Sequence, residues 1–423
     1  MTLSFTRSLL AIAVAATIAP GAALATNGYF AHGYGTKNKG MAGAGVALPQ
    51  DAMAAATNPA GMVWVGDRMD IGAALFSPRR EYTSSASGSG ATLQNAFGGA
   101  NAAESDSDYF LVPHLARNWM LGDGSSFGVA IYGNGGMNTD YPAPGPFGGG
   151  GTGVNLAQVF IAPTYSRKIG DKSSWGVSPI VAIQAFEARG LSNFTGSSSD
   201  SANLTNNQHE YSYGAGIRLG WQGEVSPGLT LAAAATSKIY MTEFDDYAGL
   251  FAEEGDFDIP PQITVGLAYK IMPRSALTFD IQHIMYGSVD SISNPIGNLF
   301  TGASGALGGS NGAGFGWEDM TIAKLGYQWQ TSSDWTWRAG VSYGEQPIPD
   351  DQVMFNILAP GVMETHLTGG FTRQMGKNNE LTMSFMYAPT KEVSGTAPAA
   401  LGGMPITIEM SQFEVEASWG WTF

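Results

Sequence analysis

The chain has 423 residues, of which 58 are glycine and none is cysteine, and 35 acidic residues outnumber 20 basic ones. Charged residues make up 13% of the chain, against roughly 25% in an average soluble domain, and 44% of the chain is hydrophobic. This composition excludes a disordered chain, and the lack of cysteine excludes disulfides, thiolate metal sites and cysteine nucleophiles. The acidic excess argues against nucleic-acid binding, which needs a basic surface.

The first 25 residues have the organisation of a secretory signal peptide. Arg7 provides a basic start, Leu9 to Ile18 form an apolar stretch, and Ala23-Leu24-Ala25 offers a small-residue cleavage site. The apolar stretch is shorter than the ~20 residues that a membrane-spanning helix needs. We therefore expect residues 1–25 to be removed and the mature chain to begin at Thr26.

The last eleven residues alternate with a period of two. Odd positions from Phe413 to Phe423 are apolar or aromatic, whereas even positions include Glu414 and Glu416. This alternation predicts a β-strand with one apolar and one polar face. A soluble sheet edge could show the same pattern, but the terminal aromatics favour a membrane strand with lipid outside and a polar lumen inside.

Fourteen segments of this kind follow one another, and the connections between them alternate in length. Short turns such as Gly122-Asp123-Gly124 and Gly376-Lys377-Asn378 alternate with long loops such as 290–316. Short turns on one side and long loops on the other are typical of outer-membrane barrels, whereas a propeller would show a fixed sequence repeat. We predict an all-β fold, a 14-stranded antiparallel transmembrane β-barrel over residues 68–423. The predicted strands are 68–83, 108–119, 125–138, 154–169, 174–191, 209–224, 228–244, 259–271, 275–289, 317–330, 334–345, 362–375, 379–392 and 406–423.

Residues 26–67 do not follow the alternation. They contain the turn-forming pair Asn58-Pro59 and are too short to build a domain core of their own. Apolar side chains such as Tyr29, Phe30 and Met41 favour packing inside the barrel lumen as a hatch. A segment hanging free in the periplasm is the alternative.

Several motifs, taken in their order and spacing, resemble the FadL/TodX (OmpP1) family of outer-membrane transporters for hydrophobic compounds and long-chain fatty acids. The motifs are Thr26-Asn27-Gly28-Tyr29-Phe30, Gly40-Met41-Ala42-Gly43-Ala44-Gly45, Asp51-Ala52, Asn58-Pro59-Ala60, Trp337-Arg338-Ala339-Gly340, Glu345-Gln346-Pro347-Ile348-Pro349 and Leu367-Thr368-Gly369-Gly370. The resemblance covers essentially the whole mature chain.

The resemblance implies a location in the outer membrane of a Gram-negative bacterium and a hatch that closes the lumen. It further implies capture of cargo in a groove between outer loops, transfer to a pocket beside the N-terminus, and lateral release through a kink in the third strand. Long-chain fatty acids are the first expected cargo, and neutral aromatic or aliphatic hydrocarbons are the alternative. The implied hatch and pocket residues are Thr26, Asn27, Gly28, Tyr29, Phe30, Asn58, Pro59 and Ala60.

The third predicted strand ends in a cluster of glycines. Gly133, Gly135 and Gly136 cannot present an apolar outer face, and glycine inside a strand marks a bulge or a bend. We expect the lateral opening at these three residues. An ordinary strand end running into a loop is the alternative.

Two of the long loops, 139–153 and 290–316, carry apolar residues, and exposed apolar clusters usually mark contact sites. We expect these loops to form the outer groove, although a plain flexible surface is the alternative for the first loop. The expected groove residues are Phe147, Ile296, Leu299, Phe300 and Leu307.

A cargo carboxylate would need a basic partner inside the barrel. By parity along the strands, the inward candidates are Arg189, Lys238, Lys324 and Arg338. Each could instead balance lumen carboxylates such as those of Glu414 and Glu416. Glu318 stands where the resemblance implies a basic residue, and this departure weakens the case for fatty-acid selectivity and leaves an uncharged hydrocarbon or aromatic cargo open.

No catalytic motif accompanies these features. The five histidines are scattered, and neither a Gly-x-Ser-x-Gly elbow nor a phosphate-binding loop occurs. We therefore expect a transporter without cofactor or metal, and keep a general porin or adhesion barrel as the less favoured alternative. Expected partners are the hydrophobic cargo, outer-membrane lipid, lipopolysaccharide and, after purification, detergent, around a monomer that binds no nucleic acid.

Overall fold

The computed structural model describes residues 26–84, 102–142, 146–148 and 150–423. The predicted signal peptide and part of the first long loop lie outside the described residues.

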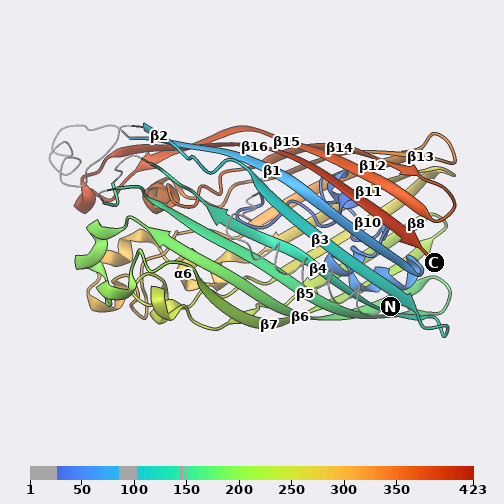
Figure 1. Ribbon diagram of the computed structural model, residues 1–423, viewed down its shortest axis with the longest axis horizontal. Coiled ribbons are helices and arrows are strands. Elements are labelled where there is room, and N and C mark those ends of the chain that lie inside the picture. The colour runs from blue at the N-terminus through green and yellow to red at the C-terminus, as the bar shows by residue number, and fades with distance from the viewer. Residues whose placement is uncertain (1–25, 85–101, 143–145, 149) are drawn as a thin grey trace.

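Fourteen long antiparallel strands form a closed barrel, as predicted, because β16 pairs with β1 from Arg68↔Thr422 to Ser84↔Ile406 (Figure 1). Two short strands, β2 and β9, pair with β1 and β7. The strands are β1 (Arg68–Ser84), β2 (Ala102–Glu104), β3 (Phe110–Met120), β4 (Ser125–Asn138), β5 (Gly153–Ile169), β6 (Ser173–Arg189), β7 (Glu210–Ser226), β8 (Leu229–Thr236), β9 (Tyr240–Met241), β10 (Gln262–Met272), β11 (Ser275–Ile284), β12 (Met320–Gln330), β13 (Trp335–Gly344), β14 (Thr365–Gln374), β15 (Asn379–Thr396) and β16 (Pro405–Thr422).

The period of two decides which side chains face outward. On β16 the ring of Phe413 is 48% exposed, whereas the next side chain, Glu414, is 2% exposed and points into the barrel. A polar group inside the barrel can be satisfied by other protein groups, whereas one facing lipid could not. The alternation in the sequence therefore translates directly into the two faces of the wall.

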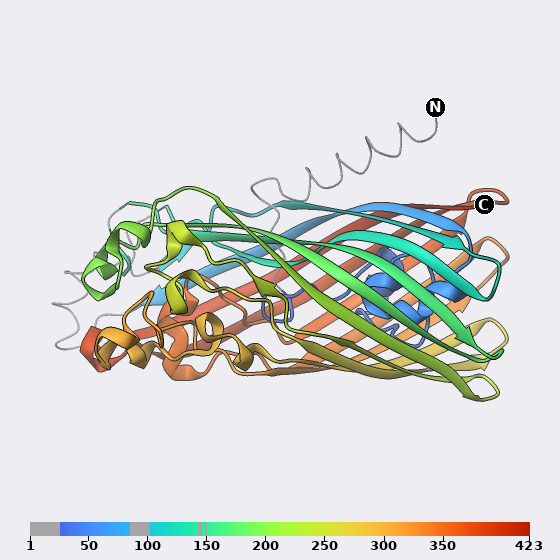
Figure 2. The same cartoon turned by 90° about the horizontal axis from the view of Figure 1, so that it is seen from below.

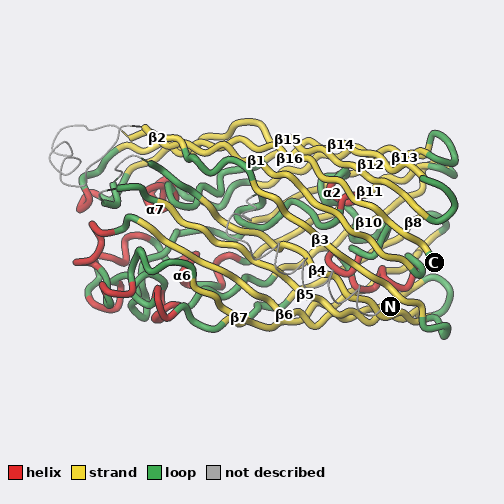
Figure 3. Tube along the Cα trace, viewed as in Figure 1, coloured by secondary structure: helices red, strands yellow, loops and turns green. Residues whose placement is uncertain are grey.

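The turns are short at one end of the barrel, and the loops at the other end are long and carry short helices (Figures 1 and 3). The C-terminus lies at the short-turn end. The loop helices are η2 (Ser192–Ser197), η3 (Ser201–Asn203), η4 (Asp245–Tyr247), α5 (Ala252–Gly255), η5 (Tyr286–Ser288), α6 (Asp290–Ser293), η6 (Ile296–Phe300), η7 (Ala303–Gly305), η8 (Asp350–Gln352), α7 (Val353–Asn356) and η9 (Ala399–Leu401). Within the described residues, no helix has the length and apolarity to span a membrane.

The seventh long strand differs from the prediction, because β8 ends at Thr236 instead of continuing to residue 244. The chain resumes pairing with β7 only at β9, one residue out of register. Ser237 causes the interruption, since its hydroxyl accepts the backbone N–H of Ile217 and so competes with the ladder.

Residues 26–67 lie inside the barrel. Figures 1 and 2 show this blue segment enclosed by the strands of the wall. The segment forms α2 (Thr36–Lys39), α3 (Ala54–Thr57) and η1 (Pro59–Trp64), and every residue from Thr26 to Ala47 is buried. Many of its apolar side chains join one core with the outer loops, whereas Val46 and Ala47 pack in a separate cluster against β8 and β10. The segment leads directly into β1 at Arg68.

Candidate transport site

An apolar cavity lies among the long loops. Its volume is about 40 Å³ in this structure, well below the roughly 300–1,000 Å³ that is usual for ligand pockets. Among the described residues that line it, only Ser291 has a polar side chain. The chemistry of this lining therefore suits an uncharged hydrophobic molecule, although the loop side chains would have to move apart to admit one.

Aromatic rings from separate parts of the chain build this cavity. Phe147 from the β4–β5 loop lies 5.9 Å from Phe194 in η2, and Phe194 lies 5.4 Å from Phe355 in α7. On the opposite wall, Phe186 of β6 lies 4.7 Å from Phe251. Offset and edge-on rings at these distances stabilise one another, so the wall is held without charged groups.

The residues predicted for the outer groove divide between the cavity and its surroundings. Phe147 and Leu307 line the cavity, Ile296 is buried in the same core, and Leu299 packs against that core. Phe300 lies outside, with 49% of its surface exposed. The participation of these residues in capture stays a prediction.

Residues 26–30 lie beside a second, smaller apolar site. The ring of Tyr29 lies 5.5 Å from Tyr286 and 6.0 Å from Trp317, and a small space of about 10 Å³ beside Tyr29 is also lined by Gly28 and Trp317. Gly28 has a φ of +63°, and a Cβ there would lie 2.5 Å from the Tyr286 hydroxyl. Only glycine fits this position without strain.

The barrel wall is interrupted between β3 and β4. Within these two strands, pairing ends at His114↔Tyr132, and Gly135 of β4 instead forms a bridge with Phe30. The N–H of Gly136 donates to the Tyr29 carbonyl at 2.9 Å, while Asn134 is bulged out of the β4–β5 ladder. β4 therefore bends inward and pairs with the N-terminal segment instead of β3.

This interruption leaves a small space of about 20 Å³ between the wall and the N-terminal segment, lined by Pro113, Tyr132 and Gly133 and also by the charged side chains of Lys39 and Glu416. A Cβ on Gly135 would lie 2.0 Å from the Tyr29 carbonyl oxygen, so only glycine permits the close approach. The predicted residues Gly133, Gly135 and Gly136 all lie at the interruption. Their function as a lateral opening stays a prediction.

Buried ion pairs anchor the N-terminal segment to the wall. Lys39 lies 3.0 Å from Glu414 and 2.7 Å from Glu416. Burial by itself would lower the pKa of Lys39, but these two carboxylates outweigh it and hold the pKa above its usual value. Lys39 is therefore a firmly charged contact between the segment and β16.

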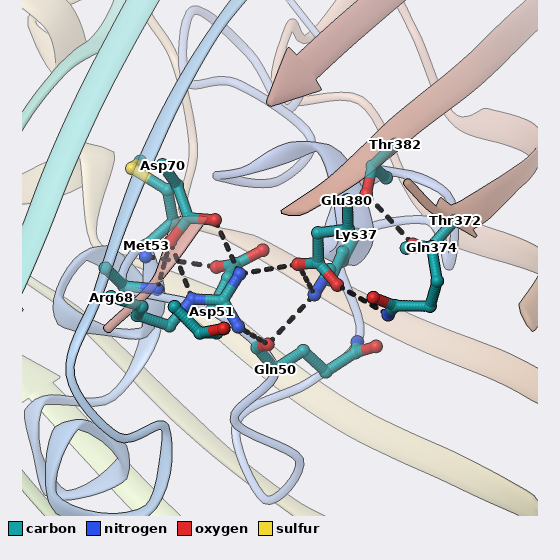
Figure 4. A network of polar contacts seen from close by, with 12 residues as sticks. Lys37, Gln50, Asp51, Met53, Arg68, Asp70, Thr372, Gln374, Glu380 and Thr382 are labelled. Atoms are coloured by element: carbon teal, nitrogen blue, oxygen red, sulfur yellow. Dashed lines mark hydrogen bonds and ion pairs between the residues drawn. The ribbon is translucent and has the colours of Figure 1, made fainter. Parts of the chain in front are cut away.

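A second group of ion pairs anchors the segment near the start of β1 (Figure 4). Glu380 of β15 lies 2.5 Å from Lys37 and 2.6 Å from Arg68, and Arg68 also lies 2.6 Å from Asp70. The amide N–H of Ala52 donates to the second oxygen of Asp70 at 2.9 Å. These contacts join α2, the following loop and two wall strands.

The Asn58-Pro59-Ala60 motif fastens the end of the segment. The Asn58 side chain accepts the N–H of Ala60 at 3.0 Å and donates to the Trp221 carbonyl of β7 at 3.2 Å. The Ala60 carbonyl accepts the Ser174 hydroxyl of β6 at 2.7 Å. Asparagine thus caps η1 and binds the wall at the same time.

With this geometry in place, the comparison with known proteins can be stated. Residues 12–418 match the model of a family described as outer membrane protein transport protein (OMPP1/FadL/TodX). The chain belongs to this family. It is thus a barrel of the Gram-negative outer membrane and a transporter of hydrophobic compounds, in a family that consists of transport channels. No curated protein sequence matches the chain.

Solved structures of FadL/TodX proteins share the fold. The toluene transporter TodX of Pseudomonas putida has a TM-score of 0.69 at 17% identity, over 93% of this chain and 99% of that one. A FadL homologue of Pseudomonas aeruginosa has a TM-score of 0.71 at 15% identity, over 94% and 100%. The toluene transporter TbuX of Ralstonia pickettii has a TM-score of 0.64 at 17% identity, over 93% and 99%. At such identities the likeness shows the fold.

The four basic candidates of this FadL-family barrel do not come together. Arg189 lies 3.1 Å from Asp140 with a side chain that is 47% exposed, and Lys238 lies 3.6 Å from Asp258 beyond the end of β8. Lys324 donates to the His32 carbonyl at 2.8 Å, and Arg338 donates to Gln50 and Thr372. Their role toward a cargo carboxylate stays a prediction.

The sequence reasoning missed Arg218 of β7, which is fully buried. Its guanidinium donates to the Ala56 carbonyl at 2.5 Å and to the Tyr132 hydroxyl at 2.8 Å, and so joins α3 to β4 across the lumen. Its inward position follows the strand alternation, so parity could have identified it.

His32 and His366 also meet inside this FadL-family lumen, with nearly parallel rings 5.7 Å apart. Burial, followed by the charge of Lys39, lowers the pKa of His32 well below its usual value, so the ring is neutral. Across the described part of the chain, no cluster of three or more histidine or acidic side chains could hold a metal ion.

Proposed function

We propose that this chain takes up uncharged hydrophobic compounds, such as small aromatic or aliphatic hydrocarbons. The cargo would be captured in the loop cavity, pass beside Tyr29 and leave sideways between β3 and β4. The observation that carries this proposal is the lining of the cavity, whose described part has Ser291 as its single polar side chain. An ionised carboxylate in such a cavity would be buried without a partner, at a high cost in free energy.

The basic side chains support an uncharged cargo as well. A carboxylate would have to displace Asp140 from Arg189, or the His32 carbonyl from Lys324. TodX and TbuX are each named as toluene transporters, and both share this fold. A fatty acid is the competing cargo, in keeping with the FadL homologue.

An aromatic path joins the two apolar sites. Phe251 lines the loop cavity and lies 4.7 Å from Phe257, whose ring lies 6.2 Å from Tyr29. A cargo that follows these rings reaches the N-terminal segment along apolar side chains, and it meets charged groups, Lys39 and Glu416, only in the space behind the β3–β4 interruption. Release into lipid also avoids returning the cargo to water, which costs about 0.8 kcal/mol per CH₂ group.

Uptake by cells that produce the protein tests the choice of cargo. We expect protein-dependent uptake of toluene and not of oleate. The substitution Leu307→Asn places an amide in the cavity wall and should lower toluene uptake about tenfold or more. Phe300→Asn, an exposed change in the same loop, is the matched control and should retain uptake. Protein-dependent uptake of oleate alone would overturn the proposal.

A disulfide tests the exit. If the β3–β4 register continued beyond His114↔Tyr132, Pro113 would face Gly133. The chain has no cysteine of its own, so the double variant Pro113→Cys/Gly133→Cys can form a single disulfide that closes the interruption. We expect oxidation to stop toluene uptake and a reductant to restore it. Full uptake with the disulfide formed would exclude this exit.

A further inference from the structure

A row of buried polar side chains crosses the inner face of four adjacent strands. Asn134 of β4, Gln158 of β5, Gln184 of β6 and Ser212 of β7 stand next to one another, and none is more than 2% exposed. We call these four residues the amide row. The row lies at the level where β4 leaves β3.

Hydrogen bonds run through the amide row in one direction. Asn134 Nδ2 donates to Gln158 Oε1 at 3.0 Å, and Gln158 Nε2 donates to Gln184 Oε1 at 3.1 Å. Gln184 Nε2 donates in turn to the Phe257 carbonyl at 2.9 Å and more weakly to the Ser212 hydroxyl. Each amide in the series donates from its nitrogen and accepts on its oxygen.

The first member of the row is the bulged residue itself. Gly133 pairs with Val159 and Gly135 with Gln158, so Asn134 is the extra residue of β4 and has no partner in the β4–β5 ladder. Its side-chain oxygen accepts the Tyr34 hydroxyl at 2.8 Å, and its carbonyl accepts the N–H of Ala31 at 3.0 Å. The bulge is therefore held from the row on one side and from the N-terminal segment on the other.

Gln184, the last amide of the row, reaches the outer loops through its hydrogen bond to the Phe257 carbonyl. Phe257 lies between Phe251, which lines the loop cavity, and Tyr29 of the N-terminal segment. The row thus connects the bulge in β4 to the loop that forms one wall of the cavity.

We propose that Gln158 and Gln184 are positioning residues that hold Asn134 in the bulge and thereby keep the β3–β4 interruption open. This inference rests on the proposed lateral release. Inside a protein an unpaired amide is costly, so each link in the row depends on the next. Without the Gln158 side chain, Asn134 Nδ2 loses its partner. β4 can then straighten and pair with the unpaired edge of β3 at Leu111 and Val112, which closes the wall.

The test uses the full-length protein in detergent and in cells. Gln158→Leu keeps the size of the side chain and removes both hydrogen bonds. We expect it to lower toluene uptake about tenfold, in line with the loss of a buried hydrogen bond. Toluene binding to the loop cavity should stay unchanged, because the cavity lining is untouched. Gln184→Leu, one step further from the bulge, should likewise lower toluene uptake and leave toluene binding unchanged. This variant replaces Gln158→Leu if Gln158→Leu does not fold.

The rate of disulfide cross-linking distinguishes a role in positioning β4 from a general effect on stability, because lower stability alone would not bring β4 beside β3. In the Pro113→Cys/Gly133→Cys background, adding Gln158→Leu should speed disulfide formation about tenfold, because β4 then lies beside β3 more often. Thr164→Val is the matched control, since Thr164 is a buried inward residue of β5 itself whose hydroxyl shares a hydrogen bond with Ser178 of β6 and not with the amide row. This control should leave the rate and toluene uptake unchanged.

The outcomes separate the two proposals. If the disulfide blocks uptake but Gln158→Leu changes neither uptake nor the cross-linking rate, the role of the amide row is refuted and lateral release stands. If the disulfide forms without blocking uptake, lateral release is refuted, and a faster cross-linking rate would still show that the row holds the bulge.

Discussion

Lys39 is a single cation buried between two carboxylates of β16, Glu414 and Glu416. A buried ion pair is weak evidence for stability, because both charges lose their water. Removing one partner is different, since the other charge then remains buried without compensation. At the scale of one residue, this asymmetry makes Lys39 the contact whose loss should free the N-terminal segment.

Lys39→Met should destabilise the packed segment by about 3–5 kcal/mol. Limited proteolysis and thermal unfolding in detergent would measure the effect. Lys172→Met is the control, because the Lys172–Glu224 pair is longer, at 3.9 Å, and exposed, and its loss should cost less than about 1 kcal/mol. The triple variant Lys39→Met/Glu414→Gln/Glu416→Gln should regain most of the stability, and a failure to do so would contradict the ion-pair explanation.

The stability of the loop between β9 and β10 should depend on pH through Asp256. Burial, followed by the nearby carboxylates of Asp258 and Glu253, raises the pKa of Asp256 to about 7. The folded loop therefore binds a proton that the unfolded chain releases at lower pH. Its stability is greatest below the ordinary pKa of an aspartate and declines as pH rises through about 7.

We expect the loop at 245–258 to be cleaved faster by protease at pH 8 than at pH 5. Asp256→Asn should remove most of this difference, because an amide does not ionise. Asp246→Asn, an exposed change in the same loop, should keep the wild-type dependence. Since Phe251 of this loop lines the cavity, toluene binding should weaken over the same pH range in the wild type alone. Equal cleavage of the wild type at both pH values would refute the assignment.

At the scale of the whole molecule, the width of the barrel explains why a segment fills it. A barrel of about eight strands can be filled by its own side chains, whereas much wider barrels enclose a channel. Fourteen strands leave room that residues 26–67 occupy, through contacts with β7, β15 and β16. The lumen is therefore filled by the packed segment and not by side chains of the wall itself.

Deleting residues 27–61 should convert the protein into an ion channel. In a planar lipid bilayer we expect a steady current from the deletion variant and none of comparable size from the wild type, because water and ions would fill the emptied lumen. Leu307→Asn is the control, since it alters the cavity and leaves the segment in place. A large steady current from the wild type would instead favour a general porin.

The sequence alone predicted the number of strands, their inward and outward faces and the end at which the loops are long. These properties are local, since a strand beside lipid must alternate and a turn must be short wherever two strands meet directly. The Asn58 motif lies in the segment that packs inside the barrel, and the glycines near Gly135 lie at the interruption of β4, while the functions predicted for both stay predictions. The early end of β8 was missed, because the competing hydroxyl of Ser237 acts only once β7 lies beside it.

Only the tertiary structure decided how the wall, the loops and the N-terminal segment meet. The glycines of β4 become an interruption because Tyr29 and Phe30, about a hundred residues earlier, take the place of β3. Phe147 and Leu307 become parts of one cavity because separate loops fold over the same end of the barrel. Such pairings join residues far apart in the chain. The local sequence pattern therefore cannot predict which distant residue will hydrogen-bond a given backbone group or pack against a given ring.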